Sequence, residues 1–295
     1  MKSSKSTQTF LPVLSLLITS TLWGVVWYPL RLLEQQGLDG LWTSLISYSS
    51  AMLLGAFWLW QDRQPWRKHP GALLLMMLAA GWCNVAFIVA VLDGTVVRVL
   101  LLFYLSPFWS LLLGWLVLGE RPHSTGWLVF VFAVAGALIM LWDPSIGMPW
   151  PTSLSDWLAA SSGFAFSVNN VLVRRMGNVS LRTKGAVSWL GVVVVAAAGI
   201  VVMHQPLPQV ASSVIGAAMV LGWLGFVIMT LTVIYGVTHM PVHRSAIILL
   251  FELVAGAVSS LWLTEEVVLP REWLGGALIL LSAWFAASAQ KAEMA

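Results

Sequence analysis

The stretch RSAIILLFELVAGAVSSLWLTEE, residues 244–266, has the pattern of a membrane-spanning helix with a carboxylate near its middle. A spanning helix needs about 20 mostly apolar residues, and this stretch supplies them between Arg244 and Glu265. Glu252 lies eight residues in. An ionisable side chain at that depth costs about 2.5–3.5 kcal/mol on insertion scales, and it usually faces a bundle interior or a wet cavity. The stretch therefore predicts a membrane protein with a polar interior.

The composition of the whole chain supports this interpretation. Of 295 residues, 59% are hydrophobic and only 9% are charged, whereas soluble domains carry about 25% charged residues. The net charge of +3 is better explained by basic loops on one side of a membrane than by binding to nucleic acid, which we do not expect. Cys83 is the only cysteine, so an intrachain disulfide is excluded.

Ten segments of spanning length fit the sequence, and the separators between them are short and turn-like. The chain begins like a signal peptide, but its apolar run is long and no small-residue cleavage site follows, so we expect a retained anchor. The predicted spans cover residues 9–32, 40–60, 70–92, 95–118, 124–142, 153–176, 183–203, 211–235, 242–263 and 270–290.

The basic residues predict the orientation of these spans. An even number of spans places both termini on one side, and twelve of the 15 Lys and Arg residues fall on that side. The remaining three are Arg31, Arg98 and Arg271. Because cytoplasmic loops carry the excess of Lys and Arg, we expect a multi-pass protein of the bacterial inner membrane with both termini in the cytoplasm.

A shift of 146 residues aligns one part of the chain with another. Residues 98–128 then fall on 244–274, with Arg98 matching Arg244 and Glu120 matching Glu266, as well as a shared Trp-Leu pair. Chance similarity between two apolar helices is the alternative. The charge pattern puts the matched residues on opposite sides, which predicts two inverted five-helix repeats, 1–148 and 149–295, that form one transport domain around a central cavity.

Several motifs carry a resemblance to a known family. They are LWGVVWYPLR (22–31), LVLGERP (116–122) followed by Trp-Leu, and FELVAG (251–256). The sequence resembles the drug/metabolite transporter superfamily in its EamA-type branch, and its length and tryptophan content are similar to YddG-type aromatic amino-acid exporters. The family often has Glu-Pro where this chain has Glu252-Leu253, while Ser106-Pro107 keeps the proline and lacks the acid. The resemblance implies that helices 1–4 and 6–9 surround the cavity and that helices 5 and 10 lie at the periphery.

Polar residues deep in the predicted spans are candidates for a substrate site. Glu252 could meet the amino group of a substrate or carry a coupled proton, or it could hydrogen-bond a neighbouring helix end and fix a bend. Asn84, Asn169 and Asn170 could bind a zwitterion or join helices to one another. Because Asn169 and Asn170 are adjacent in a helix, we expect at most one of them to face a cavity.

Most of the 18 tryptophans lie near span ends, as in interfacial belts. The deeper aromatic residues could form the walls of a cavity for a flat apolar substrate or a cation. We include Trp23, Trp27, Trp189, Tyr104 and Tyr235 among the cavity candidates. The two hinge candidates are Pro29 and Pro107, which could also merely shape the bundle.

Together these features predict a secondary transporter that exports amino acids, aromatic or otherwise hydrophobic, by alternating access. The alternative is a proton-coupled exporter of another small metabolite or a cationic drug. No P-loop, no metal-ligand spacing and no nucleophile with a matching base appears within the spans, so we expect no enzyme activity, no cofactor and no metal. The expected partners are a small-molecule substrate and the lipid bilayer, and one chain could suffice as a monomer because it carries both halves.

Overall fold

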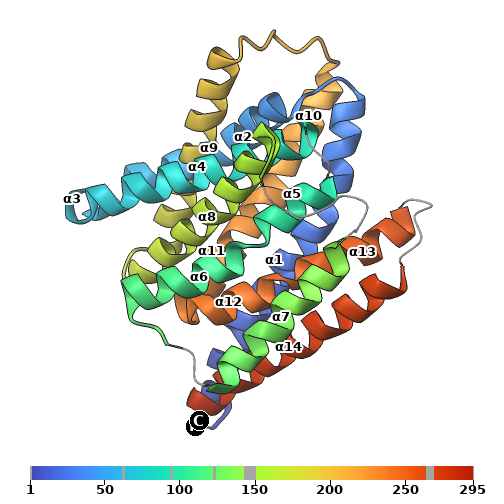
Figure 1. Ribbon diagram of the computed structural model, residues 1–295. Coiled ribbons are helices and arrows are strands. Elements are labelled where there is room, and N and C mark those ends of the chain that lie inside the picture. The colour runs from blue at the N-terminus through green and yellow to red at the C-terminus, as the bar shows by residue number, and fades with distance from the viewer. Residues whose placement is uncertain are drawn as a thin grey trace.

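The computed structural model describes residues 2–61, 64–93, 96–121, 124–142, 151–263 and 269–294. Within these ranges the regular structure is helical throughout, as predicted for an all-α protein (Figure 1). The elements are α1 (Lys2–Gln35), α2 (Gly40–Gln61), α3 (Gln64–Lys68), α4 (Pro70–Asp93), α5 (Val96–Phe103), α6 (Ser106–Leu113), η1 (Gly114–Leu118), α7 (Ser124–Leu141), α8 (Leu154–Arg175), α9 (Leu181–Val202), α10 (Ser212–Val220), η3 (Leu221–Phe226), α11 (Val227–His239), α12 (Val242–Leu249), α13 (Phe251–Leu263) and α14 (Pro270–Met294).

Several of these elements continue one another, so the described residues form ten helical segments and the short α3. The fourth segment joins α5, α6 and η1, the eighth joins α10, η3 and α11, and the ninth joins α12 and α13. Each segment lies where the sequence predicts a spanning helix. Among the described residues, six helices are long and apolar enough to cross a membrane, and Gly126–Leu141 is a shorter apolar helix. The chain is a multi-pass membrane protein, and the crossing of all ten segments stays a prediction.

The fourth and ninth segments are each interrupted once. The first interruption follows Phe103 and the second follows Leu249, a separation equal to the 146-residue shift of the sequence repeat. Pro107 lies in the first turn of α6, where a missing backbone N–H removes no helical hydrogen bond. It therefore begins a helix after a break and does not bend a continuous one. Pro29, in contrast, lies inside α1, which continues through it to Gln35.

Serines from other helices satisfy backbone carbonyl groups beside the interruptions. Ser167 of α8 donates its hydroxyl to the carbonyl oxygen of Ser106, with an oxygen–oxygen distance of 2.8 Å. The Ser20 hydroxyl of α1 donates to the Leu16 carbonyl at 2.7 Å and shares this hydrogen with the Ile248 carbonyl, which lies 3.4 Å away. Helices α1 and α8 are the first segments of the two predicted repeats, so each half receives this support from the first helix of the other half.

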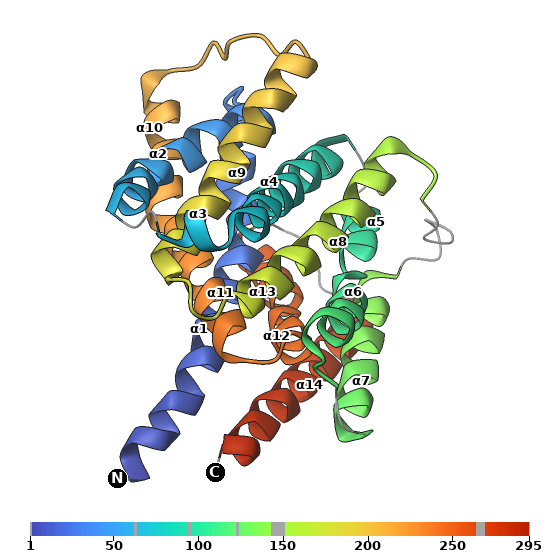
Figure 2. The same cartoon turned by 90° about the vertical axis from the view of Figure 1, so that its left-hand side faces the viewer.

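Helices α7 and α14 lie side by side at the edge of the molecule (Figure 1). Gly136 and Gly275 allow their close approach, because a Cβ atom on Gly136 would lie 2.7 Å from the carbonyl oxygen of Gly275. The other segments pack around the centre, where α1 contacts α11 and α13 while α8 contacts α4, α5 and α6. Both chain ends lie at the same end of the molecule (Figure 2).

Helices α4 and α9 cross at two glycines near the centre of the bundle. A Cβ atom on Gly191 would overlap the carbonyl oxygen of Met77, and a Cβ atom on Gly81 would overlap the carbonyl oxygen of Gly191. The two helices belong to different predicted halves. Their backbones can therefore touch only because neither position carries a side chain.

We expect Gly191→Ala to lower the melting temperature of the detergent-solubilised protein, because overpacking of a tight contact costs about 1–3 kcal/mol. Gly216→Ala is the matched control, since a Cβ atom there meets nothing within 4 Å, and alanine favours a helix more than glycine does. Thermal stability is measured by size-exclusion chromatography after heating. Equal melting temperatures for Gly191→Ala and wild type would contradict the close crossing.

Candidate functional site

A cavity of about 110 Å³ lies where the central helices meet. Its lining comes from α1, α2, α4, α8, α9, α11, the fourth segment around its interruption, and the ninth segment around its interruption. Helices α7 and α14 contribute none of the lining residues, in the arrangement that the family resemblance implies. The volume is below the roughly 300–1,000 Å³ of typical small-molecule pockets. A molecule of amino-acid size therefore requires the helices to move apart.

The two interruptions face each other across this cavity through Tyr104 and Glu252. Tyr104 follows the end of α5, and Glu252 lies in the first turn of α13. Their side chains are hydrogen-bonded to each other. The first turn of a helix carries unpaired amide groups and a partial positive charge, both of which favour a nearby carboxylate. Glu252 thus lies at a helix start beside a cavity, not within an uninterrupted helix facing lipid.

The three predicted amides all line the cavity, but they differ in what they bind. The Asn84 side-chain oxygen accepts a hydrogen bond from the Tyr48 hydroxyl at 2.8 Å, and its amide donates to the Ala80 carbonyl at 2.9 Å. Asn84 therefore joins α2 to α4. Among the described residues, the buried Oδ1 atom of Asn169 has no hydrogen-bond partner, which leaves an acceptor beside the cavity.

Asn169 and Asn170 both contribute to the lining, and the expectation that at most one of them faces the cavity directly stays a prediction. Adjacent residues point about 100° apart on a helix. The cavity extends around enough of α8 to contact both directions.

The predicted aromatic candidates divide into two groups. Trp23 and Trp189 line the cavity, and the fully buried Trp189 donates its Nε1–H to the Thr230 hydroxyl at 3.0 Å. Trp27 and Tyr235 lie outside the lining. Trp27 donates to the Ser259 hydroxyl at 2.9 Å, and the ring of Tyr235 lies 4.3 Å from that of His239.

Sequence reasoning missed a phenylalanine cluster and several hydroxyl groups in the lining. The Phe103 ring lies 4.8 Å from Phe87 and 5.7 Å from Phe166, measured between centroids. Phe103 precedes Tyr104, and Phe166 lies three residues before Asn169, so their spacing to predicted residues could have indicated them. Thr19, Ser188 and Thr230 also line the cavity, but serine and threonine are too common in these spans for sequence alone to distinguish them.

A polar cluster lies at the end of the bundle nearer the chain ends, and we define it as Glu120, Arg174, Lys184, Thr238 and the Val242 amide. Arg174 Nε lies 2.9 Å from Glu120 Oε1, and Arg174 Nη1 donates to the Thr238 carbonyl at 2.6 Å. The Val242 amide donates to Glu120 Oε2 at 2.8 Å. Lys184, which is fully buried, donates to the Val173 carbonyl at 2.9 Å and to the Thr238 hydroxyl at 3.0 Å.

This polar cluster lies one helical turn beyond the cavity. On four helices its members are four residues from a lining residue, which corresponds to about 6 Å along each axis. The pairs are Asn170 with Arg174, Ser188 with Lys184, Ile234 with Thr238, and Ala246 with Val242. The sequence alone predicts only that Arg174 and Lys184 lie on the same side of the membrane as the chain termini. No pattern indicates that two of them meet Glu120 and Thr238.

Among the described residues that line the cavity, Glu252 is the only Asp, Glu, Lys, Arg or His. Within the described ranges, no group of three or more His, Cys, Asp or Glu residues lies close enough together to hold a metal ion.

Ten helical segments around a polar and aromatic cavity define a multi-pass membrane protein with a central cavity. Comparison with known proteins finds a family match for part of the chain. Residues 10–142 match the EamA-like transporter family. This part of the chain therefore carries an EamA-like transporter domain of the drug/metabolite transporter superfamily, which confirms the EamA-type resemblance stated from the sequence, while the similarity to YddG-type exporters stays a prediction.

Individual relatives are more distant. The chain is 29% identical to Protein RarD of Salmonella typhi and equally to Protein RarD of Salmonella typhimurium. Both alignments cover 141 residues, which make up 46% of this chain. The match spans about half the length of these relatives, 48%. A protein of known crystal structure has the same fold, with a TM-score of 0.74 and 18% identity over 93% of this chain and 97% of its own.

The single cysteine provides a test of the cavity. Cys83 lines it, so we expect a small water-soluble methanethiosulfonate reagent to modify the wild-type protein in native membranes. Cys83→Ser is the control for background labelling. Val192→Trp, which places an indole in the lining, should slow the modification. Labelling that occurs only after denaturation would show that water does not reach this chamber.

Proposed function

We propose that this protein is a secondary transporter that exports amino acids, aromatic or otherwise hydrophobic, across the bacterial inner membrane by alternating access. The observation that carries the proposal is the central cavity between two interrupted helices whose breaks meet through Tyr104 and Glu252. A transporter of this class needs one site between the two halves that opens to one side of the membrane and then to the other. The EamA-like match supports transport in preference to enzyme activity.

The proposal includes two inverted halves, residues 1–148 and 149–295. Three features support it: the sequence repeat, the interruptions at equivalent positions, and the reciprocal contacts of α1 with the ninth segment and of α8 with the fourth. One chain would then contain a complete site and could work as a monomer. We further propose that both termini are cytoplasmic, in accord with the excess of basic residues and with chain ends on the same side (Figure 2).

The lining is suited to an amino acid. The Glu252 carboxylate and the free Asn169 oxygen can both accept hydrogen bonds from an ammonium group. The buried Ser188 hydroxyl, which has no hydrogen-bond partner among the described residues, can donate to a carboxylate. Trp23, Trp189 and the phenylalanine cluster offer flat apolar walls for a hydrophobic or aromatic side chain.

One observation favours a second candidate function. In the part of the chain that the structure describes, the only carboxylate in the lining is that of Glu252, and an ionised carboxylate attracts cations more strongly than it attracts zwitterions. A proton-coupled exporter of a cationic drug or another metabolite would use Glu252 as its cation site. Aromatic walls would also favour a cation by cation–π contact.

Flux measurements with purified protein in liposomes test the substrate. We expect uptake of radiolabelled Phe or Trp that unlabelled hydrophobic amino acids inhibit, and a reduction of about tenfold or more in Glu252→Gln, because hydrogen bonds to charged groups contribute about 1.5–3 kcal/mol. Glu34→Gln, at an exposed carboxylate on α1, is the matched control.

Two outcomes would contradict the substrate assignment. If no amino acid in a panel of twenty shows protein-dependent flux, amino-acid export is wrong. Strong inhibition by amphipathic cations, without inhibition by amino acids, would favour the cationic alternative. Unchanged flux and an unchanged pH response in Glu252→Gln would exclude this residue as a carrier of substrate or proton.

Alternating access also requires the polar cluster to separate when the cavity opens toward the chain ends. We expect Glu120→Gln and Arg174→Gln to speed modification of Cys83 from the cytoplasmic side of inverted membrane vesicles, because each removes the ion pair that holds this side closed. Arg175→Gln changes a neighbouring exposed arginine and should leave the rate unaltered. A double variant, Glu120→Arg with Arg174→Glu, should partly restore the slow rate. Identical rates in all variants would show that the ion pair does not control access.

A further inference from the structure

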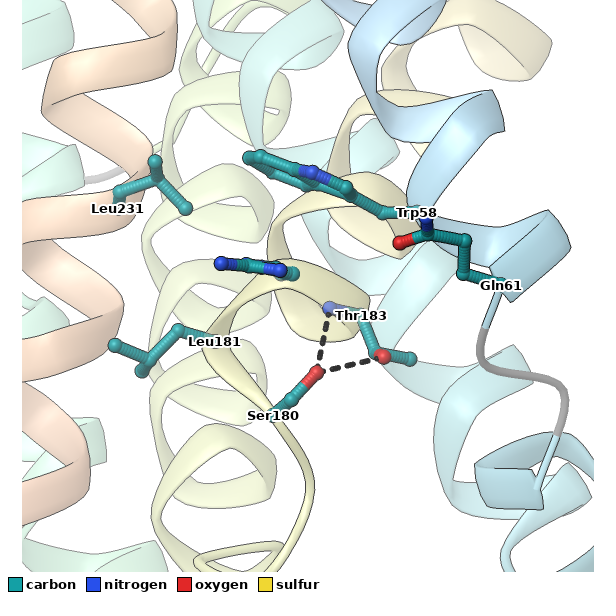
Figure 3. Close-up of a pocket in the computed structure, with 7 residues that line it drawn as sticks. Trp58, Gln61, Ser180, Leu181, Thr183 and Leu231 are labelled. Atoms are coloured by element: carbon teal, nitrogen blue, oxygen red, sulfur yellow. Dashed lines mark hydrogen bonds between the residues drawn. The ribbon is translucent and has the colours of Figure 1, made fainter.

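A second hollow, which we call the lateral cleft, lies apart from the central cavity. It has a volume of about 570 Å³ and is lined by Trp58 and Gln61 of α2, Leu181 and Arg182 of α9, and Leu231 of α11, with Ser180 and Thr183 at its edge (Figure 3). No lining residue is shared with the central cavity. Nothing in the proposed transport cycle uses this cleft.

The predicted topology places the lateral cleft at the boundary between headgroups and hydrocarbon. Helix α2 ends at Gln61 and α9 begins at Leu181, so both polar helix ends lie at the predicted cytoplasmic surface. Leu231 lies eight residues before the end of α11 at His239, which corresponds to about 12 Å along the helix axis. One wall of the cleft therefore reaches from headgroup level to acyl-chain level.

Arg182 gives the lateral cleft its charge. Its guanidinium lies 5.9 Å from the centre of the Trp58 ring, and among the described residues no carboxylate pairs with it. The start of α9 is already capped, because the Ser180 hydroxyl oxygen accepts a hydrogen bond from the Thr183 amide at 3.1 Å (Figure 3). The start of α9 therefore offers a ligand no free amide at Thr183, and the group in the cleft that can bind an anion is the Arg182 guanidinium.

A guanidinium is well matched to a phosphate group, because its planar donors bind two oxygens at once. Gln61 lies in the same lining and adds an amide donor. Trp58, Leu181 and Leu231 supply the apolar part of the cleft. This combination of a cation and a polar donor at headgroup level with apolar walls below has the chemistry of a phospholipid.

We propose that the lateral cleft binds one phospholipid with a net negative headgroup, whose phosphate contacts Arg182 and whose acyl chain lies along Trp58 and Leu231. The negative headgroup follows from charge: the twelve basic residues predicted for this side give it an excess of positive charge. A zwitterionic lipid would satisfy the apolar walls without the charge complementarity. Free inorganic phosphate would satisfy Arg182 without the apolar walls.

Native mass spectrometry of the purified full-length protein tests this proposal. The protein in mild detergent is titrated with palmitoyl-oleoyl phosphatidylglycerol, with the phosphatidylcholine of the same chains, and with inorganic phosphate. We expect phosphatidylglycerol to be retained preferentially and Arg182→Gln to weaken its retention about fivefold, as expected for one arginine at a membrane surface. Arg175→Gln, an exposed arginine outside the lateral cleft, is the matched control.

A second variant separates the apolar wall from the charge. Leu231→Trp fills the lateral cleft and should weaken retention of both lipids. Its melting temperature and that of Arg182→Gln, measured without added lipid, show whether either variant has lost its fold. Equal retention of the two lipids by wild type, or wild-type retention by a folded Arg182→Gln, would overturn the proposal. Competition by inorganic phosphate at the same concentration as the lipid would also overturn it, by assigning the site to free phosphate.

Discussion

The constraint that shapes the centre of the structure is the meeting of two helix interruptions, where Tyr104 and Glu252 border the same cavity. In lipid, backbone groups released by a broken helix must find partners inside the protein, so broken helices occur only where protein or a water-filled cavity surrounds them. Ser20 and Ser167 satisfy carbonyl groups beside the breaks. The carboxylate at depth is tolerated for the same reason, because it begins a helix and faces a cavity rather than lipid.

The positions of the helical segments could be predicted from sequence because the thickness of a bilayer fixes their length. The length of a spanning helix also predicts the separation of α4 from α5, although α4 ends at Asp93 and α5 begins as early as Val96. The interruptions could not be predicted in the same way. Pro107 looks like a kink in an apolar run, but it begins α6, and the second break has Leu253 where the family often has proline. Around the second break the ninth segment contacts α1 and Tyr104, which come from distant parts of the chain.

The cavity could be predicted only in part. Helical periodicity shows from which face of a helix a side chain projects, but it does not show which neighbouring helix or cavity that side chain contacts. Trp23 and Trp27 share a face of α1, yet Trp27 lies one turn further along and meets Ser259 outside the lining. Asn169 and Asn170 point apart and still border the same space. Lys184 carries the charge expected of a loop residue, but it is fully buried against Val173 and Thr238.

The contacts that close the two ends of the bundle differ in kind. At the end with the chain termini, Glu120 of the first half holds Arg174 and the Val242 amide of the second half through charge-assisted hydrogen bonds. At the opposite end, Trp27 of the first half reaches Ser259 of the second half through a neutral hydrogen bond. Charge-assisted bonds are roughly twice as strong as neutral ones. Among the described residues, the charge-assisted contacts therefore lie at the end with the termini, and opening at that end has to break them. A substrate or proton that reaches Glu252 could favour that opening only if it binds the opened conformation more tightly.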